Sequence, residues 1–283
     1  MAIAVATEGH VAGLLADLRE TRAALLERHP RARLLACWDL DGTLVRGDCT
    51  EGLSEHGRAV YPGLLQLAVE AGLAADYAAR GYVACRDDYA LLRQRFGPWL
   101  AYPFLAQIFA GARERDLQEL AARHFAECLA QHFFAASREV FDALGEAGVE
   151  QHVVSASPEF FVRGAAATLG LPPAQLHGIR VRVADGRLTR EVLAPVTFGA
   201  GKRERLRAIL DTPLAGFTGQ PAFVVAGFGN SFAADGPLLR HVAQQALPAG
   251  QPVAVIVNAG IPPPEYRRQF RGVRQARVVG GAR

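Results

Sequence analysis

A chain of 283 residues, 50% of them hydrophobic and 21% charged, has enough apolar side chains for a substantial core, which excludes an intrinsically disordered protein. The net charge is only +3 and the arginines are scattered, so nothing in the charge pattern calls for nucleic acid or an anionic membrane as a partner. The four cysteines show no CxxC spacing, which favours a reducing compartment. No apolar run is long enough to span a membrane, and the first twenty residues lack the basic start of a secretion signal, so we expect a cytoplasmic protein.

The first predicted elements are a helix and a buried strand. Residues 10–29 place apolar side chains roughly on one face and end at Pro30, which predicts a helix. Residues 33–40, RLLACWDL, form a short apolar run before Asp-Gly, and this suits a strand buried on both faces of a parallel sheet. From about 47 to 140 the sequence contains helical stretches and no convincing strand, so we expect an all-helical insertion after the first strand.

Strands and helices alternate in the second half of the chain. Apolar runs predict strands at 148–157, 221–230 and 252–260, each followed by a turn or a helix. Ser157 is the expected N-cap of a helix with Pro158 at its first position. This alternation predicts an α/β fold with an open parallel sheet joined by right-handed crossovers.

Three further features complete the outline of the chain. Residues 179–192 alternate in period two around Asp-Gly, which predicts a β-hairpin, and the tail from about 262 is expected to be irregular. We expect two domains. Residues 1–46 and 140–283 would form the core, and 47–139 would form a helical cap.

Polar side chains follow three of the predicted strands. In an open parallel sheet, the carboxyl ends of the strands meet at one edge, and ligands bind there. Carboxylates in this place can hold Mg²⁺, while lysine and hydroxyl groups suit a phosphate. The side chains expected at this edge are Asp39 and Asp41 after the first strand, Ser155 after the second, Asn230 and Asp235 after the third, and Lys202 at a helix start.

These residues carry a resemblance to a known family. DLDGT at 39–43 matches the DxDGT signature of haloacid dehalogenase (HAD) superfamily phosphatases, and VVSAS, GK at 201–202 and GFGNSFAAD follow in the family's order. Over residues 34–260 the chain resembles this family, and the helical insertion is similar to the cap of its phosphoserine phosphatase-like branch. The resemblance implies a Rossmann-like open parallel sheet core with an inserted all-helical cap domain.

The resemblance also implies an activity and its residues. The protein would be a Mg²⁺-dependent phosphomonoesterase that hydrolyses a small phosphorylated metabolite through an aspartyl-phosphate. Asp39 would be the nucleophile, and Asp41 would be the general acid and base. The implied metal ligands are Asp39, Asp41 through its backbone carbonyl, Asn230 and Asp235. The implied substrate-binding residues are Gly42, Thr43, Ser155, Lys202 and Asp48.

The last motif departs from the family pattern. The family usually places an aspartate directly after the first glycine and a second acid four residues later, whereas this chain has Phe228 after Gly227 or Asn230 after Gly229. We favour the alignment on Asn230, although Asp235 then lies five residues further on, a spacing similar to that of phosphorylcholine phosphatases. Either Asn230 or Asp235 could be the direct ligand. Because an amide oxygen brings no charge, metal binding through Asn230 would be weaker.

The substrate and two rival functions stay open at this point. Asp48 lies nine residues after Asp39, where phosphoserine phosphatases carry a carboxylate for the substrate's ammonium group, yet a solvated loop acid is equally consistent. Aromatic residues of the insertion could form a cage for a quaternary ammonium, although core packing is the commoner role of such residues. A catalytically silent phosphate-binding protein and a phosphotransferase are the alternatives to a phosphatase. TFGAGKR does not fit the P-loop pattern, and GFGNSF does not fit the pattern of a dinucleotide-binding fold.

Overall fold

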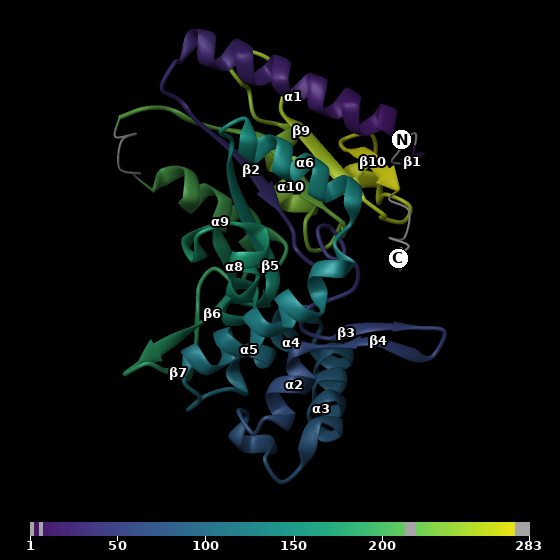
Figure 1. The fold of residues 1–283 in the computed structure, drawn as a ribbon, viewed down its shortest axis with the longest axis vertical. Helices are drawn as coiled ribbons and strands as arrows, with labels where there is room; N and C mark the ends of the chain where they lie inside the picture. Colours follow the sequence, from purple (N-terminus) through teal and green to yellow (C-terminus); the bar gives the residue numbers. More distant parts are fainter. Residues whose placement is uncertain (1–2, 6–7, 213–218, 275–283) are drawn as a thin grey trace. The chain divides into compact units, whose positions relative to one another are not determined.

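The computed structural model describes residues 3–5, 8–212 and 219–274, and the chain forms two compact units (Figure 1). The first unit comprises Met1–Leu44, Phe133–Val154 and Lys202–Arg283. The second comprises Val45–His132 and Ser155–Gly201. Among the described residues, no helix combines the length and the apolar character that crossing a membrane requires.

A parallel sheet forms the centre of the first unit. Its strands run in the order β1-β10-β9-β8-β2-β5, and the recorded pairs between these neighbours are all parallel. The strands are β1 (Ile3–Val5), β2 (Arg33–Trp38), β5 (Glu150–Pro158), β8 (Ala222–Gly229), β9 (Val253–Val257) and β10 (Arg271–Arg274). The helices are α1 (Glu8–Arg28), α6 (Ala135–Glu146), α9 (Ala200–Asp211, which starts in the second unit) and α10 (Gly236–Ala243). The predicted α/β fold with a parallel sheet is therefore confirmed.

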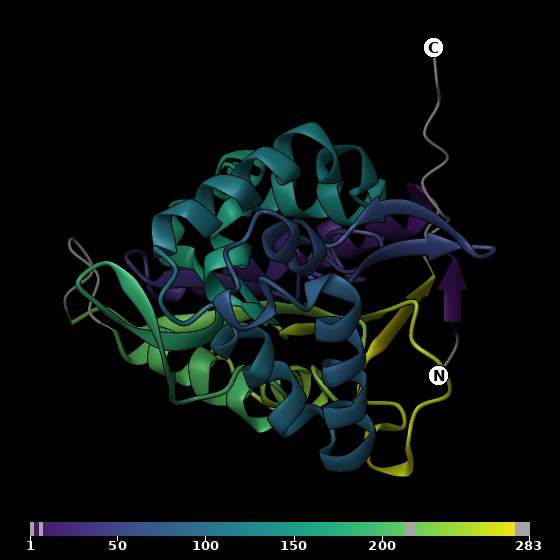
Figure 2. The ribbon, with the colours of Figure 1, turned by 90° about the horizontal axis from the view of Figure 1, so that it is seen from below.

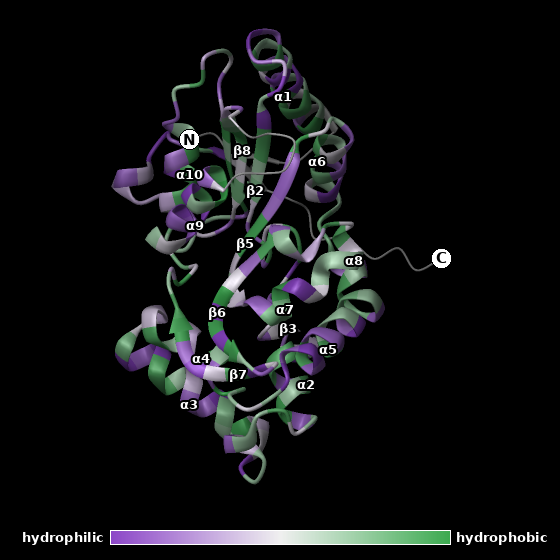
Figure 3. Ribbon diagram, turned by 90° about the vertical axis from the view of Figure 1, so that its left-hand side faces the viewer, coloured by the Kyte–Doolittle hydropathy of each residue, from purple (hydrophilic) through white to green (hydrophobic). Residues whose placement is uncertain are grey.

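Strand β2 lies where the strand order reverses. After β2 the next strand of this sheet along the chain, β5, pairs on one side of it, and β8 pairs on the other. All six residues of β2 are buried, and Figure 3 shows β2 and β8 coloured mainly as hydrophobic. Leu35 and Cys37 belong to a buried cluster with residues of α9 and α10, whereas Trp38 packs against Phe141 of α6. Side chains of β2 therefore alternate between two covered faces.

The second unit contains the insertion and the segment after β5. Its elements are β3 (Gly52–Glu55), β4 (Arg58–Pro62), α2 (Leu64–Glu70), α3 (Gly81–Phe96), α4 (Pro98–Gln107), α5 (Glu114–Glu127), α7 (Glu159–Val162), α8 (Ala166–Leu169), β6 (Leu176–Ala184) and β7 (Arg187–Leu193), with short 3-10 helices at Ala75–Tyr77, Leu129–His132, Arg163–Ala165 and Pro173–Gln175. The hairpin predicted around Asp185-Gly186 is confirmed, because β6 and β7 pair antiparallel and both turn residues have positive φ.

The expectation that the insertion is all-helical is wrong. Strands β3 and β4 form an antiparallel pair, which Figure 2 shows as a two-stranded ribbon. Its two-residue turn is His56-Gly57, with φ of 50° and 76°. A turn of this kind needs positive φ at both positions, and Asn or Asp is the usual residue before the glycine. Because His56 takes the place of the usual Asn or Asp, the sequence did not reveal this turn.

Two other expectations also fail. Ser157 is not a helix N-cap, because it lies within β5, and α7 begins after Pro158 with no side-chain cap. The tail is not wholly irregular, because Arg271–Arg274 forms β10 beside β9. Its four residues, RGVR, have too few apolar side chains to signal a strand. Backbone pairing with β9, and not an apolar side-chain pattern, makes this segment a strand.

The segment Ser155–Gly201 groups with the insertion, although we expected it in the core. Helix α4 contacts β6 and β7, and α5 contacts α7, so this segment packs onto the helices of its own unit. Which unit acts as core and which as cap stays a prediction.

Candidate active site

Asp39 stands where β2 ends. Its backbone N–H donates to the carbonyl of Phe228 at 2.8 Å, which extends the pairing of β2 with β8 by one residue. The neighbouring side chains Trp38 and Phe228 stack with ring centroids 3.7 Å apart and an angle of 7° between the planes. Because side chains alternate along an extended backbone, Trp38 on one face leaves Asp39 on the face of α9 and α10.

Lys202 joins two carboxylates in the interior. It is the third residue of α9, and its Nζ donates to Oδ1 of Asp39 and to Oδ1 of Asp235, both at 2.6 Å. The Lys202 side chain is only 1% exposed. Buried charges persist in proteins when they are paired and hydrogen-bonded, and Lys202 meets this condition through two acids. The predicted residues Asp39, Lys202 and Asp235 therefore lie together.

Asp235 organises the loop after β8. Its Oδ2 accepts the backbone N–H groups of Asn230 and Ser231, each at 2.9 Å, while its Oδ1 accepts from Lys202. A Cβ on Gly229 would lie 2.5 Å from the Cβ of Asp235, so only glycine allows this close approach. The Asp235 carboxylate thus fixes both the loop and the lysine.

The turn after Asp39 completes the arrangement. The Thr43 hydroxyl donates to Oδ2 of Asp39 at 3.3 Å, and the Thr43 carbonyl accepts from the Ser137 hydroxyl at 2.7 Å. Gly42 has φ of +75°, and a Cβ there would lie 1.8 Å from Nδ2 of Asn230. The Asn230 amide therefore lies directly against the backbone of the DLDGT turn, in space that a side chain at position 42 would fill.

This geometry distinguishes the two alignments of the last motif by location. Phe228 is 3% exposed and stacks on Trp38 in the core, so its side chain is engaged away from the carboxylates. Asn230 lies beside Gly42 and is partly exposed. Of the two candidates, Asn230 is the one that the fold brings to the acids.

The electrostatics of the cluster show a shortage of positive charge. Burial and the Asp235 carboxylate raise the pKa of Asp39 to about 7, with a further rise from Asp41, although Lys202 acts in the opposite direction. Burial alone would lower the pKa of Lys202, but the carboxylates of Asp235 and Asp39 raise it well above its usual range. Two carboxylates therefore share the Lys202 ammonium group, and the charge of Asp41 adds to theirs at Asp39.

This donor set fits a hard divalent cation. Oxygen atoms are the ligands that Mg²⁺ prefers, and the Asp39 carboxylate, the Asp41 backbone carbonyl and the Asn230 amide could supply them. Both oxygens of Asp235 already accept hydrogen bonds, so Asp235 is better suited to orient Lys202 and the loop than to bind a metal directly. A cation at this position would also offset the surplus negative charge.

Ser155 and Asp48 belong to the second unit, where each has a local role. The Ser155 hydroxyl accepts the Ser157 N–H at 3.0 Å, and its carbonyl accepts from the Thr197 hydroxyl at 2.6 Å. Asp48 Oδ1 accepts the N–H groups of Thr50 and Glu51 at 2.7 and 2.8 Å, which closes a tight turn. Their contacts with a substrate stay predictions.

Sequence reasoning missed several contributors. Ser137 and Thr197 are buried hydroxyls that hold the backbone of Thr43 and Ser155, and no motif marks them. Lys202 was predicted from the GK motif, and its being the only lysine in the sequence is a further signal that was not used. Among the insertion's aromatics, Tyr77 and Tyr89 are buried and donate to Asp88 and Glu51, which favours core packing for these two.

Comparisons with known proteins bear on the fold and on the family. A search of curated proteins finds no match. The fold is similar to that of a protein of unknown function from Bordetella pertussis Tohama I, with a TM-score of 0.60 and 19% identity over 86% of this chain and 98% of that chain. It is also similar to a functionally unknown protein from Anaerococcus prevotii DSM 20548, with a TM-score of 0.58 and 10% identity over 95% of this chain and 92% of that chain.

The family assignment comes from the sequence match. The family model described as haloacid dehalogenase-like hydrolase matches residues 36–240, which is more than half of the chain. This range begins within β2 and ends within α10, so it includes Asp39, Lys202 and Asp235. The chain, with its buried lysine held between two acids at the end of a parallel strand, belongs to the haloacid dehalogenase-like hydrolases.

Proposed function

We propose that this hydrolase is a magnesium-dependent phosphomonoesterase of the phosphoserine phosphatase-like branch that acts on a small phosphorylated metabolite. The observation that carries the proposal is the Asp39–Lys202–Asp235 ion-pair cluster, with two bonds of 2.6 Å from a lysine that is 1% exposed. An ammonium group in this position holds the Asp39 carboxylate in one orientation. It also supplies positive charge next to the atom that would attack phosphorus.

The first half of the reaction transfers the phosphoryl group to Asp39. A carboxylate oxygen of Asp39 attacks phosphorus, a new O–P bond forms, and the bond from phosphorus to the substrate's alkoxide oxygen breaks. Asp41 donates its proton to that leaving oxygen, so that an alcohol departs. Asp41 is partly exposed whereas Asp39 is buried, and this difference suits a residue that exchanges protons.

The second half restores the enzyme. Asp41, now ionised, takes a proton from water as the water oxygen attacks the phosphorus of the aspartyl-phosphate. The bond between Asp39 and phosphorus breaks, inorganic phosphate leaves, and the Asp39 carboxylate returns to its place beside Lys202 and Thr43. Lys202 acts in both halves by neutralising charge on Asp39 and the phosphoryl group.

Asp39, the backbone carbonyl of Asp41 and Asn230 would hold the metal, with Asp235 fixing the loop that carries Asn230. Magnesium, when bound, would lower the repulsion between the anionic substrate and the carboxylates. We further propose that Ser155, Gly42 and Thr43 contact the phosphoryl group and that Asp48 contacts the rest of the substrate.

Hydrolysis of a generic phosphomonoester, measured as released phosphate with and without Mg²⁺, tests this function. Wild type is expected to turn over only with the metal. Asp39→Asn is expected to lower kcat at least about a thousandfold, because it removes the nucleophile. The matched control is Asp185→Asn in the β6–β7 turn, which should retain wild-type activity because asparagine suits that turn. Equal rates for wild type and Asp39→Asn would contradict the proposal and favour a silent phosphate-binding protein.

A second assay separates a hydrolase from a phosphotransferase. Adding an alcohol acceptor leaves phosphate as the main product of a hydrolase, whereas a phosphotransferase forms a new phosphate ester. A panel that contains phosphoserine and phosphocholine then identifies the preferred substrate by kcat/KM.

A further inference from the structure

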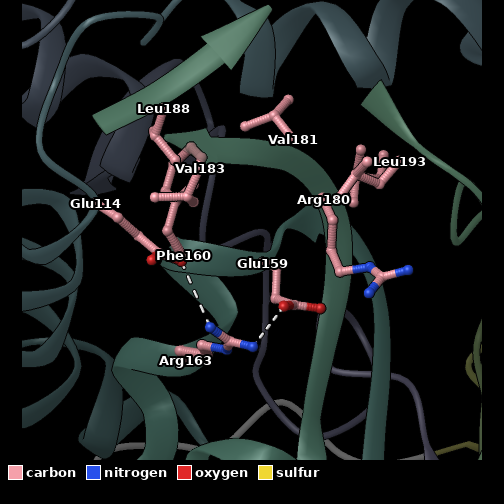
Figure 4. A pocket seen from close by; sticks show the side chains of 10 residues that line it. Glu114, Glu159, Phe160, Arg163, Arg180, Val181, Val183, Leu188 and Leu193 are labelled. Carbon is pink, nitrogen blue, oxygen red and sulfur yellow. Dashed lines mark hydrogen bonds and ion pairs between the residues drawn. The ribbon is translucent and has the colours of Figure 1, made fainter. Parts of the chain in front are cut away.

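The second unit contains a pocket of about 200 Å³ beneath the β6–β7 hairpin (Figure 4). Its lining includes none of the residues predicted for catalysis or metal binding. This volume is smaller than the sites of about 300–1,000 Å³ that bind drug-sized molecules. A ligand here would be the size of a free amino acid.

Six of the ten residues that line the pocket are aliphatic or aromatic. Phe160 and Leu188 are buried, and Val183 is 39% exposed, so apolar surface extends from the interior to the mouth. The remaining apolar lining residues are Ile179, Val181 and Leu193. An apolar side chain of a ligand would lose contact with water along this wall, which favours binding.

The charged lining residues are balanced overall but unevenly distributed. Arg163 lies between two acids, with its guanidinium 2.6 Å from Glu159 and 3.4 Å from Glu114. Two carboxylates thus share one cation, which leaves a negative surplus around Arg163. Glu159 also accepts the Gly178 N–H at 3.2 Å, so this acid is fixed in place.

Arg180 supplies the opposite surplus. Arg180 donates to the Ala194 carbonyl at 2.9 Å, and it forms no ion pair within the part of the chain that the structure describes. Arg182, two residues further along, pairs with Glu191. Figure 4 shows Glu114 and Arg180 on opposite sides of the Glu159–Arg163 pair. A guanidinium with donors to spare matches a carboxylate in geometry and charge.

We infer that this pocket binds an apolar α-amino acid, with its carboxylate at Arg180, its ammonium at the acids that share Arg163, and its side chain against the apolar wall. A zwitterion carries one charge of each sign, so it pairs with the negative surplus around Arg163 and the positive charge of Arg180 at once and leaves the net charge of the pocket unchanged.

Isothermal titration calorimetry of the full chain with L-leucine and L-phenylalanine tests the inference in the absence of any phosphate ester. At least one of the two is expected to saturate at a Kd of about 1 mM or tighter. Isocaproate lacks leucine's ammonium and isoamylamine lacks its carboxylate, so each should bind at least about tenfold more weakly than leucine. No saturation with either amino acid, or isocaproate binding as tightly as leucine, overturns the inference.

Two variant pairs locate the site. Arg180→Met should weaken binding at least about tenfold, while Arg182→Met on the same strand should stay within about twofold of wild type. Val183→Trp should fill the mouth and abolish binding, while Val60→Trp, at an equally exposed position (40%) on β4, should not. Circular dichroism checks that each variant is folded. Equal effects within either pair overturn the inference, and because no turnover is measured, this outcome is separate from failure of the proposed phosphatase.

Discussion

At the scale of single residues, the account depends on how charge is balanced around Asp39. The carboxylates of Asp39 and Asp235 share the Lys202 ammonium group, with Asp39 7% exposed and Lys202 1% exposed, and the Asp41 charge adds to theirs. A buried surplus of negative charge costs stability, so the ionised Asp39 is held at the expense of the fold. This cost depends on pH and on the presence of a cation.

In metal-free protein, Asp39→Asn is expected to increase stability at a pH of about 8. The pKa of Asp39 is raised from 3.8 to about 7 in the folded state, because burial and Asp235 disfavour its charge. The folded wild type is therefore penalised progressively as pH rises from 3.8 to about 7, and fully above that, while no penalty exists below 3.8. In urea unfolding with a chelator present, the free energy of unfolding of the Asp39→Asn variant should exceed that of wild type by more than about 1 kcal/mol at high pH. An advantage that is the same at a pH of about 3 would contradict this origin.

Gly42→Ala is expected to reduce turnover strongly, because its Cβ would displace Asn230. Gly72→Ala is a matched control, since Gly72 has the same φ of +75° but nothing within 4 Å of its Cβ. Both changes should cost about 1 kcal/mol through backbone strain. Denaturant unfolding and kcat together separate the two effects. If Gly72→Ala lowers kcat as much as Gly42→Ala does, displacement of Asn230 is not the cause.

Much of the site's composition could be read from the sequence, but its connections could not. The DLDGT run and its place after an apolar strand marked Asp39 and Asp41, and the order of motifs marked Lys202 and Asp235. The sequence could not show that Asp235 uses both oxygens on Lys202 and its own loop, because this depends on the path of residues 229–235. Nor could it show Ser137, whose hydroxyl acts through a backbone carbonyl 94 residues away.

At the scale of elements, a second ion-pair cluster ties the beginnings of β2 and β5. Arg33 donates to both oxygens of Glu150 at 3.0 to 3.2 Å and to the Thr212 carbonyl at 2.9 Å, and His152 lies 2.7 Å from Glu150. Arg33 is buried, so Glu150 is its necessary partner. The cluster lies at the amino ends of β2 and β5, and Asp39 follows the carboxyl end of β2.

Glu150→Gln is expected to destabilise the protein by about 1–3 kcal/mol at neutral pH, because Arg33 would lose its counter-charge. Burial alone would raise the pKa of Glu150, but His152 and Arg33 more than offset it and lower that pKa below 4.5. Its stabilising contribution is therefore present above pH 4.5 and lost as pH falls through the lowered value. Urea unfolding across this range measures it. The exposed Glu146→Gln is the control, and equal losses in both variants would contradict the role of the cluster.

The sequence predicted four strands from their apolar runs and the β6–β7 hairpin from its Asp-Gly turn, and it missed β1, β3, β4 and β10. Runs such as FVVAGFG and VAVIV announce strands buried on both faces, and β2, β5, β8 and β9 were found for this reason. Strands β3, β4 and β10 are short and carry polar residues, so their pairing depends on turn geometry and on neighbouring backbone. Tertiary context decided these elements.

At the scale of the whole molecule, the proposed cation should link activity to stability. A ligand that binds only the folded state raises the melting temperature, by a few degrees at saturation for a chain of this size. Adding Mg²⁺ to chelator-treated wild type is expected to restore turnover and raise Tm. Asp39→Asn should lose most of both effects, because the Asp39 carboxylate is a proposed metal ligand, while Asp185→Asn should keep them. An identical Tm shift in all three proteins would place magnesium binding elsewhere.

The most direct test of the central claim is to trap the phosphorylated aspartate. Wild type mixed with a phosphomonoester and Mg²⁺, quenched in acid and reduced with borohydride, should contain homoserine in place of Asp39 in the peptide that carries DLDGT, because borohydride reduces an acyl phosphate to an alcohol. Peptide mass spectrometry should find this product at position 39 only, and only after exposure to substrate. Homoserine at another acid, or intact Asp39 in an enzyme that is turning over, would contradict the account.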